Sequence, residues 1–105
     1  MQTLPSNFRW LTEKFGKVLE VHQQLGKVVA DAGPLDAKQV ELIKLAAAAA
    51  TQSQGSVHSH VKRALQAGAT PEEIYHTLIL LVSTVGFPIT AAALSWAREI
   101  LENSK

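Results

Sequence analysis

The segment from Gln54 to His60 and the upstream Glu41 carry side chains that could move protons. On an α-helix, Ser56 and His60 lie one turn apart on a shared face, and Ser53 joins that face if the helix begins early enough. An antiparallel pairing with the helix that contains Glu41 would bring its carboxylate toward His60. A carboxylate and an imidazole held together in an apolar surround can act as acid and base. The pattern therefore marks Glu41 and His60 as a candidate proton-transfer pair.

Structural explanations of the same residues stay open. Glu41 has Lys38 and Lys44 three residues to either side, so solvated ion pairs would explain a carboxylate there. His60 could hydrogen-bond a backbone carbonyl at the edge of the core, and the two serines could cap the helix that starts near Gly55. On the pattern alone these structural roles are favoured, because Glu and His occur together in many proteins without a shared motif.

The histidines do not form a recognisable metal site. At about 100° per residue, the side chains of His58 and His60 point roughly 160° apart, which is poor geometry for a shared ligand. A third ligand from His22 or His76 would require a coincidence that the sequence does not show. The chain also has no cysteine, which excludes disulfides, thiolate metal sites and thiol redox catalysis. No metal and no cofactor are expected.

Composition indicates a soluble helical protein. Of the 105 residues, 47% are hydrophobic and only 6% aromatic, and alanine is abundant, so tightly packed helices are favoured over an aromatic-lined pocket. The formal charge of +1 is spread along the chain and gives no footprint for nucleic acid. Residues 1–5 lack the start of a signal peptide, and the uncharged window from Thr77 to Ala97 is interrupted by Gly86 and Pro88. We expect a cytoplasmic protein with no membrane or nucleic-acid partner.

Apolar periodicity and helix-boundary signals predict an all-α domain of five helices without a sheet. The domain spans residues 1–105, with an N-terminal helix in 1–33 and the core in 35–103. Capping boxes are expected at Asp36 with Gln39 and at Thr70 with Glu73, and Gly68 should end the third helix. The predicted helices run over about Asn7–Ala30, Asp36–Gln52, Ser56–Ala67, Pro71–Val85 and Ile89–Glu102.

The first predicted helix carries a heptad-like apolar seam. Its residues alternate at spacings of three and four, with His22 filling one position: Phe8, Leu11, Phe15, Val18, Leu25 and Val29. A seam of this length requires a partner helix. The sequence leaves open whether that helix belongs to the same chain or to another subunit.

Residues Leu35 to Leu101 resemble the carboxymuconolactone decarboxylase superfamily, which includes the AhpD-type alkylhydroperoxidases. In the peroxidase branch, a helix glutamate is followed twelve residues on by the first cysteine of a CxxC pair, and a histidine lies four residues past the second. Here Ser53, Ser56 and His60 follow Glu41 at those intervals. The stretch VKRALQAGATPEEI and the later GFP also resemble the family's segments.

The resemblance implies an AhpD-like helical fold, a proton-transfer role for Glu41 and His60, and an assembly of three or six subunits. Ser53 and Ser56 would be the positional equivalents of the CxxC pair, but serine hydroxyls have no comparable oxidation ladder. The lactone-decarboxylase branch also lacks the cysteine pair and keeps a histidine at the place of His60. The resemblance to that branch therefore supports acid–base chemistry on this scaffold.

Three hypotheses about function follow. The leading one is a family member that binds a small organic molecule and performs decarboxylase or lactone-type chemistry through Glu41 and His60. The second is a non-catalytic oligomeric scaffold or binding module that has lost its redox pair. The third is a hydroperoxide reductase of the family in which serines replace the CxxC cysteines at positions 53 and 56. The sequence leaves open whether the chain is an enzyme.

Overall fold

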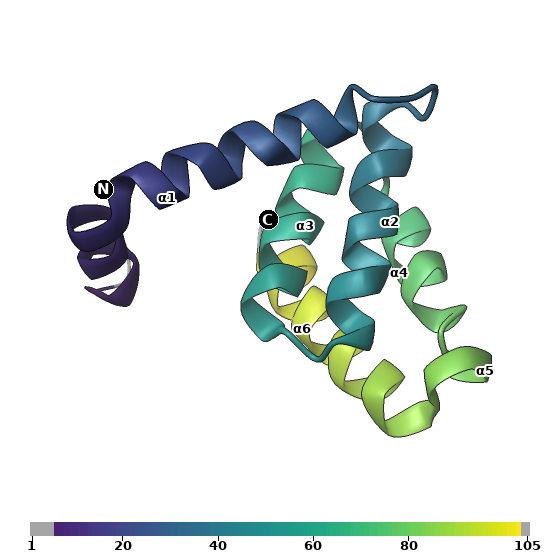
Figure 1. Ribbon diagram of the computed structural model, residues 1–105. Helices are drawn as coiled ribbons and strands as arrows, with labels where there is room; N and C mark the ends of the chain where they lie inside the picture. The colour runs from purple at the N-terminus through teal and green to yellow at the C-terminus, as the bar shows by residue number, and fades with distance from the viewer. Residues whose placement is uncertain (1–5, 104–105) are drawn as a thin grey trace. The chain divides into compact units, whose positions relative to one another are not determined.

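The computed structural model describes residues 6–103, and every regular element in that range is an α-helix (Figure 1). Residues 1–5, where no signal peptide was expected, lie outside the described part. The elements are α1 (Ser6–Ala30), α2 (Ala37–Ala50), α3 (Gln54–Gln66), α4 (Pro71–Ile79), α5 (Val82–Val85) and α6 (Phe87–Asn103). The all-helical expectation is confirmed. The chain divides into two compact units after Pro34, and the single-domain expectation stays a prediction.

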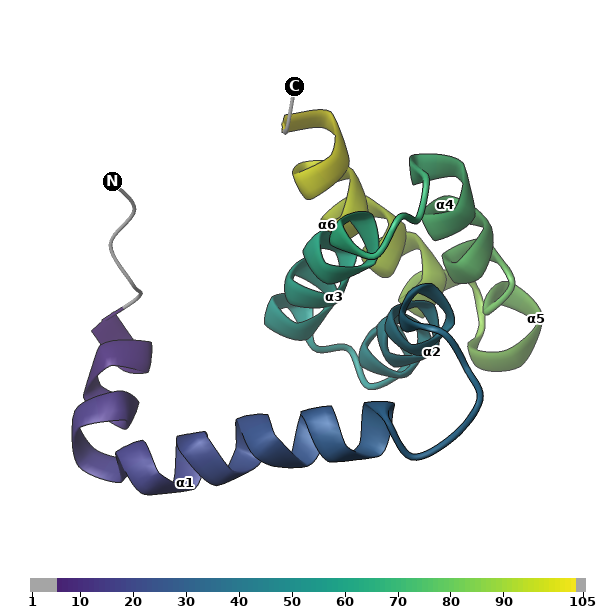
Figure 2. The same ribbon diagram turned by 90° about the horizontal axis from the view of Figure 1, so that it is seen from above.

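The unit that starts at Leu35 is built around a core shared by α2, α3, α4 and α6, which Figure 2 shows grouped together. Six of the eleven core side chains are alanine, and such small side chains let helix backbones approach closely. The core consists of Leu45, Ala48, Ala49, Val57, Val61, Ala64, Ala69, Ile74, Leu78, Ala93 and Ala97. The alanine-rich composition therefore predicted the type of packing correctly.

Both predicted capping boxes are present. The Gln39 N–H donates to Asp36 Oδ1 at 2.8 Å, and the Asp36 N–H donates to Gln39 Oε1 at 3.0 Å. The equivalent bonds between Thr70 and Glu73 measure 3.1 and 2.9 Å. Gly68 follows α3 with φ of +97°, the left-handed conformation expected of the residue after a helix C-cap. These local signals fix where α2 and α4 begin and where α3 ends.

Other predicted boundaries are wrong. The fourth helix was expected to reach Val85, but α4 ends at Ile79 and a single turn, α5, follows. No glycine or proline marks this break, and the segment that follows it is rich in β-branched residues, which favour helix weakly. The last helix begins at Phe87 rather than Ile89, because Pro88 is tolerated in the first turn of a helix. The third begins at Gln54 rather than Ser56, because Ser53 is its N-cap.

Glu73 links the start of α4 to α2 through an ion pair with Lys38, with 2.9 Å between Nζ and Oε2. The backbone N–H of Thr70, followed by the Lys38 side chain, holds the pKa of Glu73 below its ordinary value of 4.5. A lowered folded-state pKa means that the unfolded chain binds protons more readily. The stabilisation is therefore present above pH 4.5 and is lost as the pH falls through the folded-state pKa of Glu73.

We expect Glu73→Gln to lower the melting temperature near pH 7, and the difference from wild type to shrink as the pH falls below about 4.5. Glutamine keeps an acceptor for the capping box, so the variant isolates the effect of the charge. Thermal unfolding between pH 7 and pH 2 measures it. Glu72→Gln, in the same first turn of α4, is the matched control. A difference that stays constant over this pH range would contradict the account.

Helix α1 forms the other unit, and none of its side chains is buried. Its heptad seam is interrupted at Phe15, whose φ of −130° and ψ of 40° are not helical. Gly16 follows directly, and glycine is a common site of helix kinks. Large apolar side chains along the helix are 41% to 65% exposed: Phe8, Trp10, Phe15, Val18, Val21, Leu25, Val28 and Val29. Within the part of the chain that the structure describes, no helix combines the length and apolar character needed to cross a bilayer.

Candidate functional site

A tight turn between α2 and α3 brings the predicted site residues together. Gln52 adopts a left-handed φ of +60°, and the next residue, Ser53, is the N-cap of α3. The Ser53 hydroxyl accepts a hydrogen bond from the Ser56 N–H at 3.4 Å. The turn reverses the chain, so that α3 runs back beside α2 (Figures 1 and 2). This is the antiparallel pairing that the sequence required to join Glu41 to His60.

The His60 imidazole and the Glu41 carboxylate form a hydrogen bond, with 2.8 Å between Nδ1 and Oε1. The side chains are 17% and 18% exposed, so the pair is shielded from bulk water without being sealed from it. When the carboxylate is ionised it only accepts hydrogen bonds, so a neutral imidazole bonded to it would carry its proton on Nδ1 and keep its lone pair on Nε2. This arrangement orients the ring and leaves Nε2 as the basic atom.

The ion-pair explanation of Glu41 does not hold. Lys38, one of its two lysine neighbours, pairs instead with Glu73 at 2.9 Å. Among residues 6–103, no ion pair joins Glu41 to Lys44, and its recorded partner is His60. His60 likewise bonds a carboxylate through Nδ1 rather than a backbone carbonyl. Local sequence spacing suggested these alternatives, but the contact between α2 and α3 decides against them.

The two serines are near the pair on α3 and have different roles. Ser53 caps the helix, as the structural explanation proposed. Ser56 lies half-buried one turn before His60, and its backbone N–H is the group that the cap satisfies. Within residues 6–103, no recorded hydrogen bond joins either hydroxyl to Glu41 or His60. The serines therefore shape the start of α3, which positions His60.

A second imidazole–carboxylate pair lies between α3 and α6. His58 Nε2 is 3.2 Å from Glu99 Oε1, and the Gln54 amide approaches the same oxygen at 3.5 Å. This pair is more exposed than the first, at 27% for His58 and 51% for Glu99. This pair leaves no signal in the sequence, because the two residues are forty-one positions apart and share no local pattern. It provides a natural comparison for the pair of Glu41 and His60.

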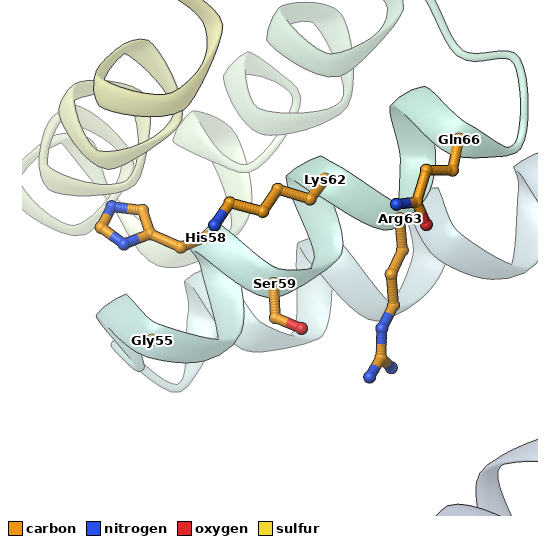
Figure 3. A pocket seen from close by; sticks show the side chains of 6 residues that line it. All are labelled: Gly55, His58, Ser59, Lys62, Arg63 and Gln66. Atoms are coloured by element: carbon orange, nitrogen blue, oxygen red, sulfur yellow. The ribbon is translucent and has the colours of Figure 1, made fainter. Parts of the chain in front are cut away.

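One face of α3 is hollowed. The hollow has a volume of about 400 Å³ and is lined by Gly55, His58, Ser59, Lys62, Arg63 and Gln66 (Figure 3). These residues recur at spacings of three and four, which was the available signal in the sequence, but their polar character looked like an ordinary solvated surface. In the described part of the chain, no group of three or more His, Asp or Glu side chains is placed to hold a metal ion.

A family model and a solved structure both point to one family. The model of the carboxymuconolactone decarboxylase family matches residues 17–99, so the match begins within α1, upstream of the segment that showed the resemblance. The crystal structure of an apo carboxymuconolactone decarboxylase family protein from Legionella pneumophila superimposes with a TM-score of 0.82 at 27% identity. That match covers 95% of this chain and 89% of the other.

A Haemophilus influenzae protein described as uncharacterized is 36% identical over 58 residues. The match covers 55% of this chain and 51% of that protein, so it spans about half the length of this curated relative. The family model covers most of the present chain, and the fold agrees with a solved member along nearly its whole length. The chain belongs to the carboxymuconolactone decarboxylase family.

Proposed function

We propose that this protein binds a small organic molecule beside His60 and transfers protons to or from it, with lactone or decarboxylation-type chemistry. The observation that carries the proposal is the 2.8 Å hydrogen bond between Glu41 and Nδ1 of His60, in a partly shielded position. Family membership supports the same class of chemistry. Because the chain has no cysteine, the proposal does not include thiol peroxidase activity.

In this mechanism Nε2 of His60 is the general base. It takes a proton from the bound molecule or from an attacking water, and the ring becomes an imidazolium stabilised by the Glu41 carboxylate. The imidazolium then returns the proton. In a decarboxylation, the bond between the carboxylate and the neighbouring carbon breaks, its electron pair stays on the organic fragment, and the Nε2 proton is delivered there. Glu41 remains ionised throughout and holds the ring in place.

A turnover screen tests the proposal. Wild type and His60→Ala are assayed against a panel of lactones and carboxylated lactones, by absorbance for ring opening and by carbon dioxide release. We expect at least one compound to be converted by wild type and not by His60→Ala. His58→Ala is the control, because it removes an imidazole from the other carboxylate pair on the same helix. No conversion by wild type, or equal conversion by all three proteins, would contradict the proposal.

We further propose that the chain works as a cytoplasmic homo-oligomer, a trimer or hexamer as the family resemblance implies. The supporting observation is α1, whose apolar side chains remain exposed and which buries none of its residues. Most of a helix's stability in a protein comes from packing of its apolar face, so α1 needs a packing partner. This observation also favours a second candidate function, a non-catalytic oligomeric scaffold, in which the fold is retained for assembly alone.

The double variant Val18→Glu with Leu25→Glu is expected to reduce the assembly to monomers, because each copy would place two charges in the apolar seam. Sedimentation equilibrium at micromolar concentration measures the mass. Gln23→Glu with Gln24→Glu is the matched control, since it adds the same charge to exposed positions outside the seam and should leave the mass unchanged. A monomeric wild type, or an unchanged mass in the seam variant, would overturn the proposed role of α1.

A further inference from the structure

The hollow on α3 is positively charged. Lys62 and Arg63 contribute two full charges to its lining, and no carboxylate is among the six lining residues. From this and from its place next to His60, we infer that the hollow binds the carboxylate end of a small organic acid, with Arg63 as the residue that anchors it. The inference rests on the proposed function for the reaction that follows, but the binding itself can be measured separately.

The two cations have no carboxylate partner of their own. Elsewhere in the same unit, Lys38 pairs with Glu73 at 2.9 Å and Arg98 pairs with Glu102 at 2.7 Å. Among residues 6–103, no carboxylate oxygen lies within 4.0 Å of the side-chain nitrogens of Lys62 or Arg63. The positive potential of the hollow is therefore not offset by a carboxylate of the described chain, and it favours an anionic ligand.

Arg63 is better placed than Lys62 to hold a carboxylate. Figure 3 shows Ser59 and Arg63 projecting to the same side of α3, while the Lys62 side chain runs back along the helix toward His58. A guanidinium can donate two parallel hydrogen bonds to a carboxylate, which an ammonium cannot do. The Ser59 hydroxyl, one helical turn before Arg63, can add a third donor. Lys62 contributes positive potential to the same hollow.

The anion site and the proton-transfer pair are neighbours on one helix. His60 follows Ser59 directly and lies three residues before Arg63, and side chains at that spacing are roughly 5–6 Å apart at Cβ. His60 does not line the hollow, so a molecule whose carboxylate is held by Arg63 reaches the imidazole by extending along the neighbouring turn of α3. Gly55, at the other end of the hollow, has no side chain, and an added Cβ there would meet no atom within 4 Å. The arrangement favours a compact ligand with one anionic end.

An NMR titration with benzoate tests the inference on the full chain. Benzoate is expected to shift the backbone amide signals of residues 59–63 in a saturable way, whereas benzamide, its neutral counterpart of similar shape, binds at least tenfold more weakly. Arg63→Gln should weaken benzoate binding by tenfold or more, equivalent to about 1.4 kcal/mol. Arg63→Lys should recover only part of that loss, because it restores the charge without the paired donors. Lys27→Gln removes a cation from α1 and should change nothing.

The results separate this inference from the proposed function. Benzoate binding that survives His60→Gln but not Arg63→Gln supports the anion site, whatever the turnover screen gives. Benzoate and benzamide binding equally, Arg63→Gln and Lys27→Gln behaving alike, or signal shifts confined to residues outside 59–63 would each overturn it. If benzoate binds as expected but His60 variants lose no turnover, the anion site stands and the proposed acid–base role is the part that fails.

Discussion

Glu41→Gln is expected to lower the turnover of any compound that the protein converts by about 10²- to 10⁴-fold, the usual contribution of positioned acid–base catalysis. Glutamine has nearly the same shape as glutamate but no charge, so it can neither stabilise an imidazolium nor require a proton on Nδ1. The hydrogen bond of 2.8 Å would be kept or replaced at little structural cost. The loss should therefore fall on the rate constant kcat rather than on ligand affinity.

Kinetic coupling between Glu41 and His60 would show that the two residues act in the same catalytic step. The double variant Glu41→Gln with His60→Gln should be little slower than His60→Gln alone, since a carboxylate with no imidazole to orient has nothing to contribute. The matched control is Glu99→Gln, which removes the carboxylate from the more exposed pair with His58 and should leave turnover within about twofold of wild type, as expected for a weak surface pair. If the loss of turnover in the double variant equalled the product of the losses in the two single variants, a shared mechanism would be contradicted.

Leu45→Ala is expected to destabilise the protein by about 2–5 kcal/mol, the range for deleting a fully buried leucine side chain. Leu45 lies on α2, one turn after Glu41, and is 0% exposed within the shared core. Many of its core neighbours are alanines, which cannot reach across to fill the vacated space. Since small proteins are stable by only about 5–15 kcal/mol, this single change removes a large share of the total.

Urea unfolding measures that loss, and Leu80→Ala provides the control. Leu80 is also a leucine but is 59% exposed at the end of α4, so its replacement should change the unfolding free energy by less than about 0.5 kcal/mol. Equal effects of the two substitutions would show that the core assignment is wrong. A destabilised Leu45→Ala should also lose turnover near its melting temperature, because the core packing holds α2 and α3 in register.

The elements with local signals were predictable from the sequence. Asp36 and Gln39 stand next to each other in space because they are three residues apart on one helix, and the same holds for Thr70 and Glu73. The break after Ile79 was missed because it falls within an apolar run that carries no glycine or proline, and the β-branched residues after it were only a weak signal. The kink at Phe15 was missed because the apolar spacing continues through it, and the adjacent Gly16 was only a weak indication.

The candidate site was predictable only in part. The spacing of Glu41 and His60 suggested a meeting across two antiparallel helices, and the structure places them within hydrogen-bond distance. Which ring nitrogen is engaged could not follow from spacing, because it depends on the relative rotation of α2 and α3. The role of Arg63 was not found either, since a cation on an exposed helix face has many possible explanations until its missing partners and the hollow beside it are seen.

The serines at positions 53 and 56 argue against the third hypothesis, a peroxidase in which serines replace the cysteines. Ser53 serves as the N-cap of α3, a role that explains a serine there without reference to redox chemistry. A hydroxyl oxygen cannot pass through the sulfenic and disulfide states on which thiol peroxidases depend. Acid–base chemistry at His60 needs neither serine to react.

The protonation state of the His60 ring tests, without a substrate, whether Glu41 orients the imidazole as a general base. A long-range ¹H–¹⁵N correlation spectrum of uniformly labelled protein, recorded above the titration range of the ring, distinguishes the two neutral tautomers. We expect the proton on Nδ1, bonded to Glu41, with Nε2 unprotonated, and we expect Glu41→Gln to weaken that preference. A proton found on Nε2 in the wild type, or a ring spectrum unaffected by Glu41→Gln, would contradict the assignment of His60 as a general base oriented by Glu41.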